Sequence, residues 1–165
     1  RAVYDATTTQ AFVEAGYRFG GEGWGLEPFV QFARVSVDTD GFAEAGGLAA
    51  LTGGSSDADV DLATWGLRGS LELKAAHQDA SWLSLRGSVA RRHAGGDRLP
   101  ATSMGWTGSG AFTVEGAPIA RRATVVEAGF AARTGQSSLL EFGYSGQYAD
   151  EARDHGVNAR WSKRF

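Results

Sequence analysis

The feature that most constrains this chain is a long alternation of apolar and polar residues, repeated in seven segments. Successive side chains of a β-strand point to opposite faces of a sheet, so the alternation predicts strands with one apolar and one polar face. In one segment Trp65, Leu67 and Leu71 alternate with Gly66, Arg68 and other polar or small residues. We therefore predict an all-β, antiparallel fold with strands at residues 4–20, 24–38, 60–74, 81–93, 121–133, 138–149 and 155–165.

The predicted strands are longer than those of an ordinary soluble sheet. They run for roughly 12 to 16 residues, whereas strands of globular proteins usually have about 5 to 6 and a membrane-spanning strand needs about 9 to 11. Their polar faces carry charges of both signs, which a dry core would not accommodate but a water-filled lumen would. We predict a transmembrane β-barrel whose lumen is lined by Glu14, Arg18, Arg68, Glu72, Arg86, Glu127, Arg133, Glu141 and Arg160.

Composition excludes several other classes of protein. The 24 glycines among 165 residues disfavour long helices, and no apolar run approaches the roughly 20 residues of a transmembrane helix. The net charge of -3 provides no basic surplus, so we expect no nucleic-acid partner. The absence of cysteine excludes disulfides, thiolate metal ligands and thiol nucleophiles. Residues 1–10 lack the apolar core of a signal peptide.

The connections between the predicted strands alternate in length. Residues 21–23, 75–80 and 134–137 form short connections, whereas residues 39–59 and 94–120 form long ones and residues 150–154 an intermediate one. Outer-membrane barrels have short periplasmic turns and longer extracellular loops. The alternation therefore predicts that the C-terminus lies on the periplasmic side.

Seven strands are an odd number, whereas a bacterial barrel closed within one chain has an even number. Counting residues 102–108 as an eighth strand would place the long connection 39–59 on the periplasmic side. We therefore expect the chain to be incomplete, with strand edges that pair either with upstream strands of the same barrel or with another copy.

Several motifs, in order along nearly the whole chain, resemble the C-terminal translocator of autotransporters, the type V secretion proteins of Gram-negative bacteria. They are residues 4–10 (YDATTTQ), 14–19 (EAGYRF), 26–29 (LEPF), 37–42 (VDTDGF), 65–68 (WGLR), 86–88 (RGS), 111–114 (AFTV), 116–121 (GAPIAR), 143–147 (GYSGQ) and 154–156 (DHG).

The resemblance implies the C-terminal seven strands of a 12-stranded outer-membrane barrel that anchors an N-terminal passenger domain and supports its export to the cell surface. Outer-membrane lipid and the barrel-assembly machinery are the implied partners. By resemblance, Trp161 and Phe165 form the assembly signal, although Lys163 stands where the family often has an aromatic residue. The family's chemistry resides in the passenger, so the resemblance implies that this chain is not an enzyme.

No catalytic, cofactor or metal site is predicted in the chain itself. Residues 108–110 and 143–146 do not fit the G-x-S-x-G pattern of a nucleophilic serine. The spacing of Asp57, Asp59 and Asp61 is compatible with calcium, but the glycine and glutamate of an EF-hand loop do not follow, and a solvated loop is the favoured interpretation. Single histidines at 77, 93 and 155 are interpreted as solvated residues.

Three functions are compatible with the sequence. The favoured one is an autotransporter translocator. An independent porin-like pore and a soluble, β-rich adhesin fragment are the alternatives, and the upstream part of the gene would distinguish among the three.

Overall fold

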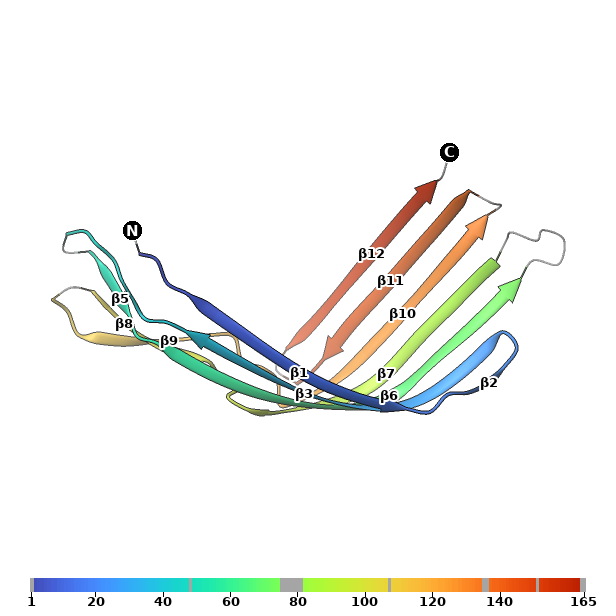
Figure 1. Ribbon diagram of the computed structural model, residues 1–165, viewed down its shortest axis with the longest axis horizontal. Helices are drawn as coiled ribbons and strands as arrows, with labels where there is room; N and C mark the ends of the chain where they lie inside the picture. Colours follow the sequence, from blue (N-terminus) through green and yellow to red (C-terminus); the bar gives the residue numbers. More distant parts are fainter. Residues whose placement is uncertain are drawn as a thin grey trace. The chain divides into compact units, whose positions relative to one another are not determined.

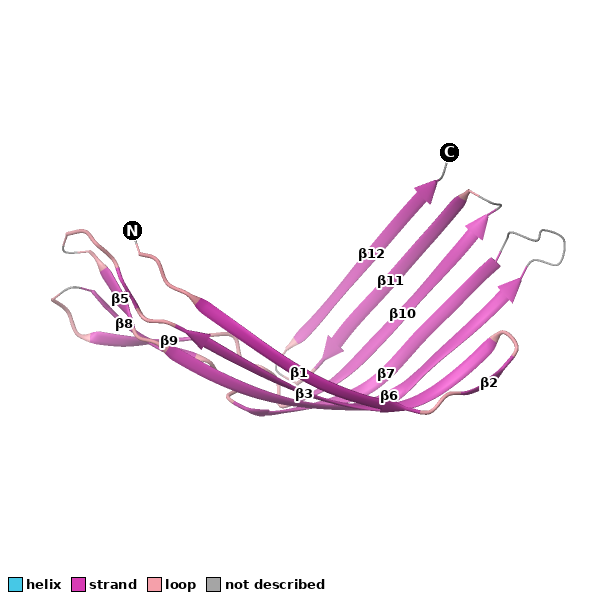
Figure 2. Cartoon of the chain, in the orientation of Figure 1, coloured by secondary structure: helices cyan, strands magenta, loops and turns pink. Residues whose placement is uncertain are grey.

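The computed structural model describes residues 2–47, 49–74, 82–106, 108–134, 137–150 and 152–163. All regular structure in these residues is β-strand (Figure 2). Within them, no helix is long and apolar enough to cross a membrane. The strands are β1 (Ala6–Gly16), β2 (Phe19–Gly21), β3 (Trp24–Thr39), β4 (Phe42–Ala43), β5 (Leu51–Gly53), β6 (Ser56–Lys74), β7 (Trp82–Gly96), β8 (Ala101–Trp106), β9 (Ala111–Glu115), β10 (Arg122–Thr134), β11 (Ser138–Tyr148) and β12 (Arg153–Lys163).

The long strands form a meander in which each pairs with the next long strand along the chain. Their order is β1, β3, β6, β7, β10, β11 and β12, with the short β2 added to β3 (Figure 1). The pairings of β10 with β7, β10 with β11 and β11 with β12 are antiparallel and continuous. The predicted all-β, antiparallel fold is confirmed, and the seven predicted segments coincide with the long strands to within a few residues.

The final strand ends beside a short turn. Lys163 pairs with Ser138, so the end of β12 lies next to the start of β11. At the same end of the meander, Gly23 closes the turn between β2 and β3 with a φ of 79°, a backbone conformation that favours glycine. The turn predicted at residues 75–80, which contains His77, lies outside the described residues. The same holds for Phe165, part of the predicted assembly signal.

Four short strands form a second sheet in the order β4, β5, β8 and β9. These strands lie within the long connections predicted at residues 39–59 and 94–120. Leu51 of β5 pairs with Trp106 of β8, and Met104 of β8 pairs with Phe112 of β9. The segment 102–108 thus does contribute a strand, but this strand belongs to the second sheet and not to the meander.

The chain divides into two compact units, and the backbone passes several times from one unit to the other. The first contains residues 1–13, 32–62 and 94–121, including the second sheet, and the second contains residues 14–31, 63–93 and 122–165. The hydrophobic residues that are buried in the described part of the chain are small or medium in size: Ala50, Val60, Ala90, Ala94 and Ala123. The strands therefore expose large apolar side chains instead of packing them into a second layer, as a soluble sheet would.

Candidate functional site

The two faces of the second unit differ in chemistry. Side chains directly opposite each other in paired strands share a face. On β7, β10, β11 and β12, one row consists of Leu85, Phe130, Phe142 and Ala159, and the neighbouring row on the other face consists of Ser84, Ala131, Glu141 and Arg160. We call these the apolar face and the polar face. The rings of Phe130 and Phe142 stack with centroids 5.7 Å apart.

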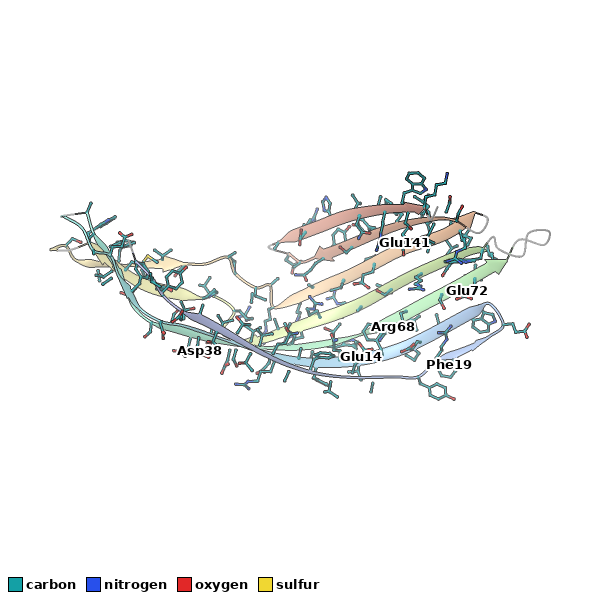
Figure 3. The ribbon with its side chains drawn as sticks, turned by 45° about the horizontal axis from the view of Figure 1, so that its top comes forward. Glu14, Phe19, Asp38, Arg68, Glu72 and Glu141 are labelled. Atoms are coloured by element: carbon teal, nitrogen blue, oxygen red, sulfur yellow. The ribbon has the colours of Figure 1, made fainter. Side chains whose placement is uncertain are left out.

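An ion-pair cluster on the polar face centres on Arg68 of β6. Its guanidinium contacts the carboxylate of Glu14 on β1, and its Nε lies 3.6 Å from Oε1 of Glu27 on β3 (Figure 3). The guanidinium carbon also lies 4.3 Å from the ring centroid of Phe29, in a cation–π arrangement. Arg68 therefore links three strands through one side chain.

A half-open hollow of about 420 Å³ lies beside this cluster. Six charged residues line it, three arginines and three glutamates: Arg18, Arg68, Arg86, Glu27, Glu72 and Glu127. Arg18 donates a hydrogen bond to Ser70 at 3.2 Å, and Ser88 donates one to Glu127 at 3.1 Å. A Cβ at Gly25 would lie 2.6 Å from the guanidinium of Arg18, so the glycine leaves room for that arginine in the wall of the hollow. The wall is charged but balanced, and its polar atoms are accessible to water or to a peptide segment.

Three of the predicted lumenal residues lie on the polar face away from the hollow. Glu141 and Arg160 are direct neighbours across β11 and β12, an arrangement in which opposite charges attract. The guanidinium of Arg133 lies 5.8 Å from the ring centroid of Trp82. The structure thus groups Glu14, Arg18, Arg68, Glu72, Arg86 and Glu127 around the hollow and leaves the other three apart.

Large apolar side chains of the apolar face are exposed on several strands. Val157 and Trp161 of β12 expose 71% and 68% of their surface, and Val89 of β7 exposes 52%. Such exposure would be costly in water, because an apolar surface of this extent is stable only against another apolar phase. Aromatic residues lie near both ends of the face: Trp161 near the short turns, and Tyr148 at the opposite end of β11. This arrangement is typical of membrane strands, whose aromatic girdles mark the two interfaces.

Comparison with known proteins agrees with these two faces. Residues 1–145 match the protein family described as "Autotransporter beta-domain". The chain belongs to this family. Two curated proteins of Serratia marcescens, both named "Extracellular serine protease", are each 31% identical to it over 166 aligned residues. The alignments cover 100% of this chain but 16% of each relative, so the chain spans about a sixth of the length of these proteins. Family membership places the β-domain in the outer membrane of Gram-negative bacteria.

Some polar-face contacts of the β-domain were not predicted from the sequence. Arg92 donates hydrogen bonds to Gln147 at 3.0 Å and to Thr64 at 3.4 Å, which joins β7 to β11 and to β6. Its place on the polar face follows from alternation, but its partners lie 55 and 28 residues away in sequence. The aromatic supports under Arg68 and Arg133 were likewise missed, because Phe29 and Trp82 carry no signal beyond their position on that face.

The proposed assembly signal of the β-domain is described only in part. Trp161 lies on the apolar face opposite Leu140. Phe165 lies outside the described residues.

A separate polar cluster occupies the first unit. The carboxylate of Asp59 accepts hydrogen bonds from Ser36 and from Arg34, and Arg34 also lies 3.6 Å from Asp61. The hydrogen bond from Ser36, followed by that from Arg34, lowers the pKa of Asp59 below its ordinary value, and Asp59 in turn raises the pKa of Arg34. The spacing of Asp57, Asp59 and Asp61 in the sequence is compatible with calcium. In the structure, Arg34 provides a positive charge beside Asp59 and Asp61.

Proposed function

We propose that this β-domain is an outer-membrane translocator and anchor that supports the export of an N-terminal passenger domain to the cell surface. The observation that carries the proposal is the single-layer sheet of the second unit, whose two faces are opposite in chemistry. Its apolar face suits contact with outer-membrane lipid, whereas its polar face suits a water-filled lumen. The nine predicted charged residues, from Glu14 to Arg160, would line that lumen.

The charged hollow supports a role in contacting the exported chain. Three arginines and three glutamates line it, so a peptide with polar groups of either sign would find partners there. Charged and hydroxyl side chains are interspersed with Phe29 and Ala128 in the lining of the hollow. A passenger segment would therefore be held by exchangeable polar contacts, which suits transit.

The two ends of the meander support one orientation of the β-domain in the membrane. We propose that the short-turn end, where β12 finishes, faces the periplasm and that the second sheet lies at the cell surface. The described sheet has β1 at one edge and β12 at the other, and both strands are exposed throughout almost their whole length. Upstream strands of the same barrel, or another copy of it, would pair with these edges. Trp161 and Phe165 would be recognised by the barrel-assembly machinery.

The names of the relatives support a secreted protease as the passenger. Because the similarity covers the β-domain only, the passenger's activity is a separate proposal from translocation. A serine-protease inhibitor applied to the exported passenger would test it: loss of proteolysis supports the proposal, and unaffected proteolysis overturns it.

Export of the passenger tests the translocator proposal. The full-length protein and a version lacking residues 1–165 would be produced in a Gram-negative host, and the passenger would be detected on intact cells with an antibody. We expect surface passenger only with the β-domain present, and periplasmic passenger without it. Equal amounts of passenger on the surface in both cases would overturn the proposal.

A further inference from the structure

Three arginines gather on the apolar face of the second unit, at the end away from the short turns. The register places Arg91 of β7, Thr124 of β10, Tyr148 of β11 and Arg153 of β12 in one row. Arg122 lies in the next row, opposite His93. All three arginines are exposed. They come from three different strands, so their clustering is a property of the fold and not of the local sequence.

Four rows that are largely apolar, with His155 in the row nearest the arginines, lie between these arginines and the short turns. The rows are Val89, Val126, Gly146 and His155; Gly87, Ala128, Tyr144 and Val157; Leu85, Phe130, Phe142 and Ala159; and Leu83, Ala132, Leu140 and Trp161. Successive rows on one face are two residues apart along each strand. The four rows therefore approach the span of about 9 to 11 residues that a tilted strand needs to cross a bilayer. The arginines therefore begin where the hydrocarbon contact ends, at the level of lipid headgroups.

The three guanidinium groups carry charge that the described residues do not neutralise. The ion pairs in that part of the chain involve Arg34 and Arg68, and none involves Arg91, Arg122 or Arg153. Arg91 donates a hydrogen bond to the hydroxyl of Thr124, which orients it along the row and leaves other N–H groups of its guanidinium available.

The spacing of the arginines suits phosphate groups. Arg91 and Arg122 are diagonal neighbours on adjacent strands, about 7 to 8 Å apart at the backbone, which lets both guanidinium groups reach one phosphate. Arg153 is three strands from Arg91, roughly 14 Å away at about 4.8 Å per strand, with Tyr148 between them. Planar guanidinium groups bind phosphate through paired hydrogen bonds, and tyrosine is favoured at the same membrane depth.

We propose that Arg91, Arg122 and Arg153 form a binding surface for the phosphate groups of a phosphorylated lipid in the leaflet at the long-connection end of the β-domain. The inference rests on the proposed function, since it requires the apolar face to contact lipid. It adds a specific headgroup chemistry to a face that otherwise needs only hydrocarbon. The bound phosphates would fix the depth and the tilt of β7, β10 and β12 in the membrane.

Binding of lipid A, a glycolipid with two phosphates, tests the proposal. The full-length protein in neutral detergent micelles would be titrated with lipid A and with its dephosphorylated form. We expect the phosphorylated form to bind at least about tenfold more tightly, and this preference to weaken with added salt. Equal affinity for the two forms would overturn the proposal without requiring any variant to fold.

A pair of triple variants locates the site. Arg91→Gln, Arg122→Gln and Arg153→Gln together are expected to lower the affinity for lipid A by at least about tenfold. The matched control is Arg86→Gln, Arg133→Gln and Arg160→Gln, which removes the same charge from the same three strands on the polar face. Retained affinity in the first variant, or equal loss in both, would overturn the assignment. Should the first triple variant fail to fold, Arg153→Gln alone is expected to give a several-fold loss.

The two proposals fail in different ways. A wild-type protein that does not adopt a heat-modifiable, folded form in micelles would contradict the membrane function itself. A folded protein that does not distinguish phosphorylated from dephosphorylated lipid A would contradict the phosphate surface and leave the translocator proposal intact.

Discussion

Arg68 lies over the ring of Phe29, with its guanidinium carbon 4.3 Å from the ring centroid, while the same group contacts Glu14. Substitution of Arg68 by alanine would leave Glu14 and Glu27 facing each other without a cation. We expect Arg68→Ala to destabilise the folded β-domain by about 1 kcal/mol, because the pair is partly exposed to solvent. The temperature at which the folded form unfolds on gel electrophoresis measures this effect.

Arg68→Lys provides the control for that prediction. Lysine keeps the charge but loses the planar group that stacks on Phe29 and reaches two carboxylates at once. An intermediate unfolding temperature is expected. An alanine variant as stable as the wild type would show that the cluster contributes nothing to stability.

Neighbouring residues of β12 offer a direct contrast between the two faces. Val157 lies on the apolar face opposite Tyr144, and Asn158 lies on the polar face opposite Gly143. We expect Val157→Arg to reduce the folded, membrane-inserted fraction strongly, because a charge on the lipid side costs about 2 to 4 kcal/mol at the bilayer midplane. Asn158→Arg is expected to insert normally. Equal behaviour of the two variants in outer-membrane fractions would contradict the assignment of the faces.

Aromatic residues near the end of the chain are expected to affect the assembly of the β-domain into the outer membrane. Trp161→Ala and Phe165→Ala should each lower the amount of β-domain in the outer membrane while leaving its synthesis unchanged. Pulse-chase labelling followed by membrane fractionation measures both quantities. Ser162→Ala is a suitable control, because Ser162 lies on the polar face opposite Leu139. Undiminished membrane levels in both aromatic variants would count against an assembly signal here.

The pH dependence of the first unit is expected to involve Asp59. Its carboxyl has a lowered pKa in the folded state, so its ion pair stabilises fully above the ordinary aspartate pKa of about 3.9 and is lost as the pH falls through the lowered value. The protection of β6 amides against hydrogen exchange, relative to the intrinsic rate at each pH, should therefore fall below about pH 4 in the wild type. Asp59→Asn should remove this acid-dependent step, and an unchanged step in that variant would assign it to another group.

The faces of the strands could be predicted because alternation is a local property. Leu85 and Phe130 on one side, and Glu127 and Arg160 on the other, follow from counting residues within a single strand. The pairing of the long strands can be predicted as well, because successive antiparallel strands of a meander are neighbours.

The contacts between distant residues could not be predicted in the same way. Arg34 with Asp59, and Arg92 with Gln147, depend on the register between strands, which a shift of one residue would change. The second sheet escaped prediction because its strands are short: β5 has three residues and pairs with β8 about fifty residues later. Such short segments show no alternation that distinguishes them from an irregular loop.

Solvent accessibility along β10 tests the central claim most directly. Residues 1–165 contain no cysteine, so each introduced cysteine is the sole thiol of this segment, and any cysteine elsewhere in the full-length protein would first be replaced by serine. Spin labels would be attached to single cysteines in the membrane-inserted full-length protein, at Val126, Glu127, Ala128, Gly129 and Phe130 in turn. We predict that labels at 126, 128 and 130 collide mainly with lipid-soluble oxygen and that labels at 127 and 129 collide mainly with a water-soluble nickel complex. Uniform exposure to the nickel complex, or no alternation between neighbours, would contradict a sheet with one face on lipid and the other on a water-filled lumen.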